Sequence, residues 1–150
     1  MSAIWPFPLT RRVPLEVGDQ ALLYTTRGVF RNPPRDLGRV VGTAVITSPV
    51  VPLGSQRQIA GRVYTSGCEL RITGLAPPGD GVVLADFVER LEVFQPYPRA
   101  WSARMRRSIL PLPPRDAEVI SAQLEPTLRN PSDTAGAYLE RAERASKRAG

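Results

Sequence analysis

The chain has 150 residues, of which 42% are hydrophobic, and it carries a formal net charge of +6 with a pI near 10.4. This length allows one domain with a core of its own and excludes a second large one. The basic residues are almost all arginine, since Lys147 is the only lysine. They favour a polyanionic partner such as nucleic acid, although codon usage in a GC-rich genome explains the same composition.

The cysteine and histidine content excludes several kinds of site. Histidine is missing and Cys68 is the only cysteine, so the chain lacks the commonest general base and any partner for an intramolecular disulfide. We expect no zinc site and no cofactor, and we expect Cys68 to be a small buried thiol. There is no signal peptide and no apolar run near the roughly 20 residues that span a bilayer. We therefore expect a soluble, cytoplasmic protein without a membrane partner.

The first 17 residues contain Pro6, Pro8 and Pro14. Proline lacks an amide hydrogen and restricts the residue before it. We therefore expect an irregular, proline-rich lead-in over residues 1–17, through which no central strand runs.

Two β-prone runs follow the Gly18-Asp19 turn, and a long polar loop separates them. They predict strands over Gln20–Thr26 and Arg39–Thr47. Loops of this length inside a compact domain usually bind something, so we expect function here. The loop and its ends contain several arginines and two residues that tolerate positive φ: Arg27, Arg31, Arg35, Arg39, Gly28 and Asn32.

The middle of the chain predicts further short elements. Ser48–Ala60 is expected to be irregular, Arg62–Ile72 a strand with a bulge or bend at Gly67, and residues 77–81 a firm turn before a short strand over Val82–Leu84. Ala85–Leu91 has its apolar residues at helical spacing, which predicts one or two helical turns. Glu92–Phe94 is expected to form another short strand.

Tyr97–Leu112 combines an aromatic residue with a row of arginines. Trp101 is followed by Arg104, Arg106 and Arg107. In an extended conformation Arg104 and Arg106 share one face of the chain. A ring beside guanidinium groups is what a base-stacking site with phosphate contacts needs.

The C-terminal part predicts two helices. Prolines precede a helix over Arg115–Leu124, which is expected to close the core. Residues 126–150 form a polar tail with a last helix, for which Ser132 or Asp133 is the expected cap. Its thin apolar stripe indicates a frayed appendage or a weak partner surface.

Two segments together resemble the EVE domain, a member of the PUA-like superfamily that also contains the ASCH and YTH domains. The first joins the Gly18-Asp19 turn, a strand ending at Tyr24, the Thr-Thr-Arg-Gly loop and the strand Val41-Gly42-Thr43-Ala44-Val45. The second joins Leu91, Trp101, Arg106-Arg107-Ser108-Ile109 and a short helix led by Asp116. The resemblance covers about residues 18–125.

This resemblance implies an α+β fold, a small and strongly bent mixed β-barrel with short helices packed at its ends and a C-terminal helical tail. It also implies a non-enzymatic nucleic-acid-binding module that reads a modified base, flipped out of DNA or RNA into an aromatic-walled pocket. Tyr24, Thr25, Thr26 and Arg27 would line the rim, with Trp101 close by. The full set of expected nucleic-acid-binding residues is Tyr24, Thr25, Thr26, Arg27, Arg31, Asn32, Arg35, Trp101, Arg104 and Arg106.

One departure from the EVE pattern concerns the N-terminus. EVE domains usually begin with an aromatic-bearing strand well upstream of the Gly-Asp turn, and only 17 residues precede Gly18 here. Either the start lies further upstream, or Trp5 replaces the missing wall. A strand edge left open in this way favours a weak homodimer by edge pairing.

Other interpretations remain open from the sequence. Trp101 and Tyr24 fit equally a role as core aromatics, with the arginines as a solvated rim. A protein-interaction or structural module whose basic surface is incidental would use the tail or Pro111–Pro114. An enzyme is disfavoured because the carboxylates lie beside turns and caps and no phosphate-cradling glycine motif is present.

Overall fold

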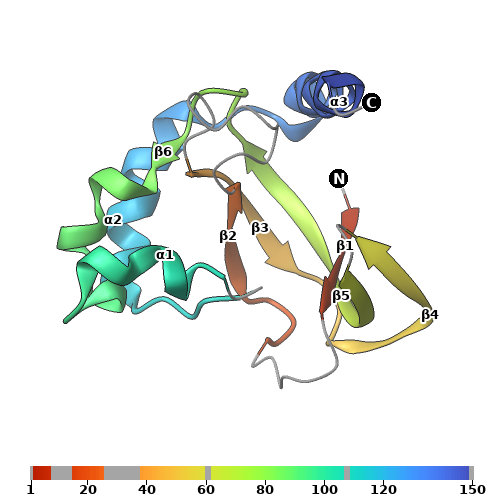
Figure 1. Cartoon of the computed structure of the whole chain (residues 1–150), viewed down its shortest axis with the longest axis horizontal. Helices are drawn as coiled ribbons and strands as arrows, with labels where there is room; N and C mark the ends of the chain where they lie inside the picture. The colour runs from red at the N-terminus through yellow and green to blue at the C-terminus, as the bar shows by residue number, and fades with distance from the viewer. Residues whose placement is uncertain (1, 8–14, 26–37, 60–61, 107–108, 149–150) are drawn as a thin grey trace. The chain divides into compact units, whose positions relative to one another are not determined.

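The computed structural model describes residues 2–7, 15–25, 38–59, 62–106 and 109–148 (Figure 1). The protein is a mixed α+β protein with an antiparallel sheet and short helices, as the sequence predicts. The described residues contain one sheet whose strands follow the path β1-β5-β3-β2, with β4 pairing to β5 and β6 to β3. The chain divides into two compact units, Met1–Ala21 with Thr43–Thr73, and Leu22–Gly42 with Gly74–Gly150.

In the first unit β5 (Arg62–Leu75) is flanked by two antiparallel strands, as Figure 1 shows at the right. β1 (Ser2–Phe7) pairs with it from Ser2 opposite Arg71 to Phe7 opposite Ser66. β4 (Val51–Ile59) pairs with it too, and its register shifts between Pro52 and Arg57. The buried residues described in this unit are Ala44, Ile46, Cys68 and Leu70.

Two of these strands correct the sequence-based expectations. β1 lies within the lead-in expected to be irregular, and β4 lies within the connection expected to be irregular. Pro6 lies in β1, which ends the strand path, and proline is tolerated in edge strands of this kind. Of the bulge or bend expected at Gly67, the β1 pairing shows no bulge, because its register is continuous there, and the register shift lies in β4.

The Gly18-Asp19 turn is held by its own hydrogen bonds. Gly18 has φ of 95°, which a residue with a Cβ rarely adopts. Its N–H donates to the Ile46 carbonyl at 2.8 Å, and the Ile46 N–H donates to the Asp19 carbonyl at 2.9 Å. The Asp19 carboxylate accepts from the Glu16 N–H at 2.9 Å. The turn therefore fixes the start of β2 against β3, and Asp19 has a structural task there.

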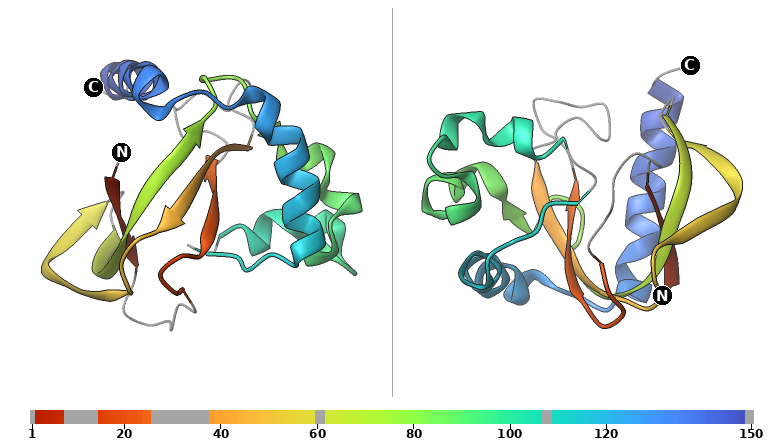
Figure 2. Two further views of the ribbon diagram at one scale, coloured as in Figure 1. Left: turned by 180° about the vertical axis from the view of Figure 1, so that it is seen from behind. Right: turned by 90° about the horizontal axis from the view of Figure 1, so that it is seen from below.

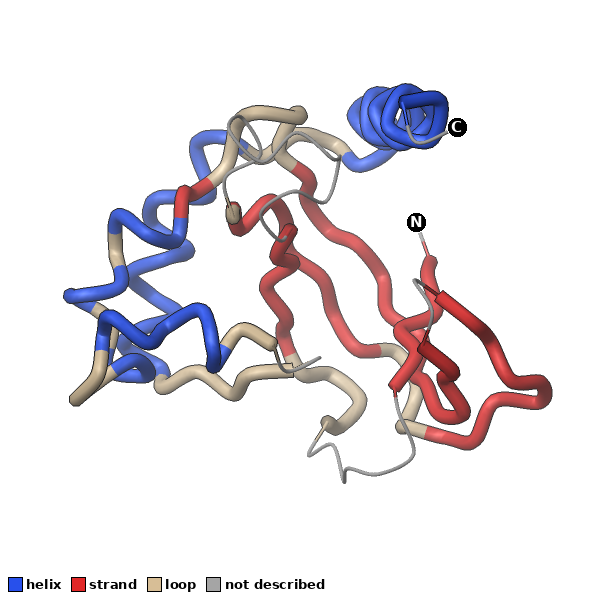
Figure 3. The backbone as a smooth tube through the Cα atoms, in the orientation of Figure 1, coloured by secondary structure: helices blue, strands red, loops and turns tan. Residues whose placement is uncertain are grey.

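The second unit contains the ends of the predicted strand pair and most of the helical residues, drawn in blue in Figure 3. β2 covers Gln20–Thr25 and β3 covers Arg39–Ile46, close to the predicted bounds. The short strand β6 (Val82–Val83) pairs antiparallel with the start of β3 and follows the expected turn, in which the Asp80 N–H donates to the Pro77 carbonyl.

Short helical turns then lead to the longer helices. They are η1 (Leu84–Asp86), η2 (Val88–Arg90), η3 (Glu92–Phe94), η4 (Pro98–Ala100), α1 (Trp101–Arg104), α2 (Pro114–Leu124), η5 (Glu125–Thr127) and α3 (Pro131–Arg148). The turns within Ala85–Leu91 and the helix α2 confirm the predictions, whereas Glu92–Phe94 is a 3-10 turn rather than a strand. Both views of Figure 2 show α2 beside these turns.

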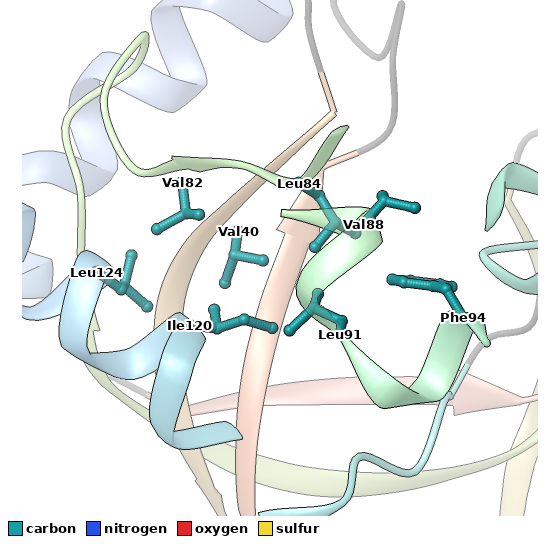
Figure 4. Close-up of a cluster of buried hydrophobic side chains, with 8 residues drawn as sticks. All are labelled: Val40, Val82, Leu84, Val88, Leu91, Phe94, Ile120 and Leu124. Atoms are coloured by element: carbon teal, nitrogen blue, oxygen red, sulfur yellow. The ribbon is translucent and has the colours of Figure 1, made fainter. Parts of the chain in front are cut away.

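One hydrophobic cluster joins these elements, and Figure 4 shows its side chains pointing toward one another. Val40 of β3 lies between the side chains of α2 and those of the 3-10 turns. Ile120 and Leu124 occupy the i and i+4 positions of one stripe of α2, so both are buried against the cluster. The members are Val40, Val82, Leu84, Val88, Leu91, Phe94, Ile120 and Leu124.

The last helix is only partly an appendage. Asn130, not Ser132 or Asp133, caps it, because the Asn130 Oδ1 accepts from the Ser132 N–H at 3.0 Å. Pro131 and Thr134 are buried, and the Tyr138 hydroxyl donates to the Ala76 carbonyl. The first turns of α3 are therefore attached to the second unit, while the residues after Tyr138 whose burial is described are exposed.

Candidate nucleic-acid interface

Tyr24 and Thr25 end β2, immediately before the predicted binding loop. The Tyr24 ring is half-buried and packs against the hydrophobic cluster. Its hydroxyl lies so close to the backbone of Gly38 that a Cβ on Gly38 would overlap it. The Thr25 Oγ1 donates to the Arg39 carbonyl at 3.4 Å. These two side chains therefore tie the start of the loop to the residues that follow it.

Burial also changes the ionisation of this tyrosine. Desolvation raises the pKa of the Tyr24 phenol above its ordinary value of 10.0. The ring is therefore neutral at physiological pH and presents an uncharged hydrogen-bonding group at the base of the loop. The five predicted loop residues Thr26, Arg27, Arg31, Asn32 and Arg35 lie outside the described residues.

Trp101 begins α1 and is half-buried. Its ring meets the ring of Phe94 edge to face, with centroids 6.1 Å apart and planes at 74°. Phe94 is itself only 1% exposed, so it is a fixed part of the core. Trp101 therefore packs against the cluster while remaining partly exposed.

A buried carboxylate fixes the turn from which Phe94 projects. Asp116 is 1% exposed and lies in the first turn of α2. Its two oxygens accept from the backbone N–H groups of Glu92, at 2.9 Å, and Val93, at 2.8 Å. Asp116 thus satisfies two amide groups at the start of η3. It supports the position of Trp101 through Phe94 and is engaged in a structural role.

The expected extended arrangement of the arginines is wrong, because η4 and α1 are helical and the turn continues to Arg106. The N–H groups of Met105 and Arg106 donate to the carbonyls of Trp101 and Ala103. In this conformation Trp101 and Met105 share the inner side, and both pack against the cluster. Arg104 and Arg106 are exposed, but they do not alternate along one face as they would in a strand.

Sequence reasoning missed two exposed residues of the same segment. Tyr97 is 71% exposed, and Arg99 is exposed two residues further on. A charge count would have found the region, because residues 93–115 contain no Asp or Glu. The five arginines there account for most of the net charge of +6: Arg99, Arg104, Arg106, Arg107 and Arg115.

The described residues therefore bring together part of the predicted site. Tyr24 and Trp101 pack on the same hydrophobic cluster, and the exposed arginines lie in the helical segment that Trp101 begins. Such a surface offers an aromatic ring and guanidinium groups, which are suited to stacking and phosphate contact. Among the described residues no group of three or more His, Cys, Asp and Glu is placed to hold a metal ion.

Comparison with protein-family models and with curated proteins finds no match for this chain. A function for the protein is therefore argued from its own residues. None of the helices in the described ranges has both the length and the apolar character of a membrane-spanning segment. Cys68 is 2% exposed, as predicted, and burial raises the pKa of its thiol above the ordinary value.

Proposed function

We propose that this chain is a non-enzymatic nucleic-acid-binding module that reads a modified base flipped into an aromatic pocket. One observation carries the proposal. Trp101 is only partly buried and contacts the fixed core residue Phe94, at the start of a helical segment with exposed arginines and no acidic neighbours in sequence. A ring held in this way is already ordered, so stacking on a base costs little additional entropy.

In such a site the free energy gained by stacking offsets the cost of flipping the base, so no catalytic group is needed. Flipping a base costs a few kcal/mol of stacking and pairing, and each base that stacks on an aromatic side chain returns about 1–3 kcal/mol. Phosphate contacts add affinity by releasing counterions. Asp19 and Asp116, two carboxylates that begin candidate turns or helices, both accept hydrogen bonds from backbone amides. This engagement supports a non-enzymatic role.

The finer features of the EVE-like interpretation belong to the same proposal. They are a strongly bent PUA-like barrel, a pocket rimmed by Tyr24, Thr25 and the loop after them, and a weak homodimer through an open strand edge. β1 and β2 end the strand path, so either would supply the edge for pairing.

A binding screen tests the proposal. Fluorescence anisotropy with matched plain and modified DNA and RNA oligonucleotides, all at one stated salt concentration, is expected to identify a modified oligonucleotide bound at least tenfold more tightly than its plain partner. Trp101→Phe should retain this preference and Trp101→Leu should lose it, with both variants folded by circular dichroism. Equal affinity for every plain and modified pair would contradict the reader function.

One observation favours a second candidate, a protein-interaction module. The residues of α3 after Tyr138 whose burial is described are exposed, and Leu139 is 66% exposed. Deleting residues 139–150 keeps the Asn130 cap and the Tyr138 hydrogen bond to Ala76. If this deletion leaves nucleic-acid binding unchanged but removes a co-purifying protein, the end of α3 serves a partner and the basic segment serves nucleic acid.

A further inference from the structure

Tyr97 is 71% exposed, more than any other large hydrophobic side chain whose burial the structure describes. It caps the start of η4 and stands between Pro96 and Pro98. Two prolines restrict the backbone on both sides of it. A tyrosine side chain also has few torsions to immobilise, so it offers a large contact area at low entropic cost. The ring is displayed to solvent from a restricted backbone.

The residues that follow Tyr97 include exposed arginines and, between them, small side chains. Arg99 lies in η4 and Arg106 in the turn that follows α1. Ser102 and Ala103 lie between them, and all four residues are exposed. We name Tyr97, Arg99, Ser102, Ala103 and Arg106 the outer surface of η4 and α1. Small side chains at its centre leave the two guanidinium groups accessible.

No opposing charge neutralises this surface within the described part of the chain. The carboxylates described there lie beyond ion-pair distance of Arg99 and Arg106, and the ion pair found elsewhere joins Arg144 to Glu140 at 3.9 Å. Residues 93–115 contribute no acidic side chain. Charge complementarity therefore favours a polyanion as the occupant, and the adjacent ring favours one with flat, unpaired faces.

From these observations we propose that the outer surface of η4 and α1 binds single-stranded nucleic acid, with Tyr97 stacking on an unpaired base and Arg99 and Arg106 contacting phosphates. This inference rests on the proposed function and names its ligand class. In a duplex each base face is covered by its neighbours, so an exposed ring gains stacking only where the bases are unpaired. Tyr97 would then hold a base beside the one that is read at Trp101.

The test compares unmodified single strands with hairpin duplexes of the same length and composition, by fluorescence anisotropy at one stated salt concentration. The wild-type protein is expected to bind the single strand more tightly. Tyr97→Ala should weaken that binding about 5- to 150-fold, as expected for one lost stacking contact. Tyr97→Phe and Tyr97→Trp should retain it. Leu139→Ala removes another exposed apolar side chain, on α3, and should change nothing.

The outcomes separate this inference from the function beneath it. If the wild-type protein binds no nucleic acid at all, plain or modified, the proposed function fails and the inference falls with it. If it binds nucleic acid but Tyr97→Ala binds as well as wild type, the inference alone is overturned. A preference for the hairpin duplex would overturn it too. Melting temperatures equal to wild type would show that Tyr97→Ala reports on binding rather than on folding.

Discussion

Trp101 and Tyr97 lie four residues apart in the same basic segment, yet their rings differ in burial. Trp101 is half-buried and meets Phe94 edge to face, whereas Tyr97 is 71% exposed. The first ring belongs partly to the core, and the second belongs to the surface. Sequence proximity therefore does not decide which ring stabilises the fold. Tyr97 precedes the first helical residue of η4, whereas Trp101 begins α1 and contacts Phe94.

The same contrast extends to the other aromatic residues of the second unit. Tyr24 packs over Gly38, and Tyr138 donates a hydrogen bond to the Ala76 carbonyl. We call Trp101, Tyr24 and Tyr138 the seated rings. Changes at or beneath a seated ring should affect stability first, and changes at Tyr97 should affect binding alone. The following predictions test this division in order of expected effect on stability.

Asp116→Ala should give the largest loss. It removes the carboxylate that accepts from the Glu92 and Val93 amides, beneath the turn that carries Phe94. Two orphaned amides in a partly buried site should lower the free energy of unfolding by about 2–4 kcal/mol. Denaturant unfolding measures this loss. Asp116→Asn keeps one acceptor oxygen, so its loss in the free energy of unfolding should be about half as large. If Asp116→Ala loses less than about 0.5 kcal/mol, the Asp116 carboxylate does not stabilise η3.

Trp101→Ala should lower the free energy of unfolding by about 2 kcal/mol, less than the 3–5 kcal/mol typical of a fully buried tryptophan. The edge-to-face contact with Phe94 accounts for part of this loss. Trp101→Phe retains a ring and should lose under about 1 kcal/mol. Thermal and denaturant melts measure both variants. An unchanged free energy of unfolding in Trp101→Ala would mean that Trp101 adds no more to the core than Tyr97 does. That result would contradict the distinction between the two rings.

Gly38→Ala should destabilise the base of the loop by about 1–2 kcal/mol, because the new Cβ overlaps the Tyr24 hydroxyl and forces the ring to move. Removing that hydroxyl should relieve part of the overlap. The double variant Gly38→Ala with Tyr24→Phe is therefore expected to be more stable than the sum of the single losses predicts. Strict additivity in this double-mutant cycle would show that the two residues do not touch.

Alkaline pH should weaken the protein through its seated tyrosines. Burial raises the pKa of Tyr24 and of Tyr138 above the ordinary 10.0, so the folded state holds these protons more tightly than the unfolded state does. The stability that these two tyrosines contribute is therefore fully retained below pH 10 and falls as the pH rises through their folded-state pKa values. Cys68 adds a loss of the same sign, beginning near its ordinary value of 9.0.

Unfolding curves collected between pH 8 and 12 measure this loss. The double variant Tyr24→Phe with Tyr138→Phe is the matched comparison, because it keeps both rings and removes both protons. Its stability is expected to depend less on pH above 10 than that of the wild type. Identical slopes in the two proteins would contradict the burial of the phenols.

Tyr97→Ala should have the smallest effect on stability, within about 0.5 kcal/mol of wild type, as expected for an exposed position. Thermal melting beside the binding measurement checks this. A clear fall in melting temperature would mean that Tyr97 packs onto the body of the protein, and the division between seated and exposed rings would then fail.

The sequence predicted β2 and β3 well, because β2 has the apolar run Ala21–Tyr24 and β3 is rich in β-branched residues that it buries. The sequence-based prediction missed β1 and β4 because both segments contain prolines, which are unfavourable in central strands. Only the tertiary structure shows that β1 is an edge strand. The conformation of Trp101–Arg106 was missed for a related reason. The segment is short and has weak periodicity, so its contact with Phe94 decides between helix and strand.

The residue types of the candidate site could be predicted from the sequence, but their exposure and contacts could not. The aromatic and arginine residues of the basic segment were visible in the sequence, and so was the missing acidic charge around them. The exposure of Tyr97 and the contact of Asp116 with amides more than 20 positions earlier depend on tertiary packing. Neither follows from local pattern, because both arise from how α2 and the 3-10 turns meet.

The salt dependence of binding tests the central claim, nucleic-acid binding through the basic segment, most directly. The affinity of the wild-type protein for a single-stranded oligonucleotide would be measured at salt concentrations from about 50 to about 200 mM. Arg99→Gln with Arg106→Gln should reduce the slope of log affinity against log salt by about 1.4, since each phosphate contact to a single strand contributes about 0.7. Arg71→Gln with Arg144→Gln removes the same charge from other exposed positions and should leave the slope unchanged. Equal slopes in both double variants, or binding that ignores salt, would contradict the account.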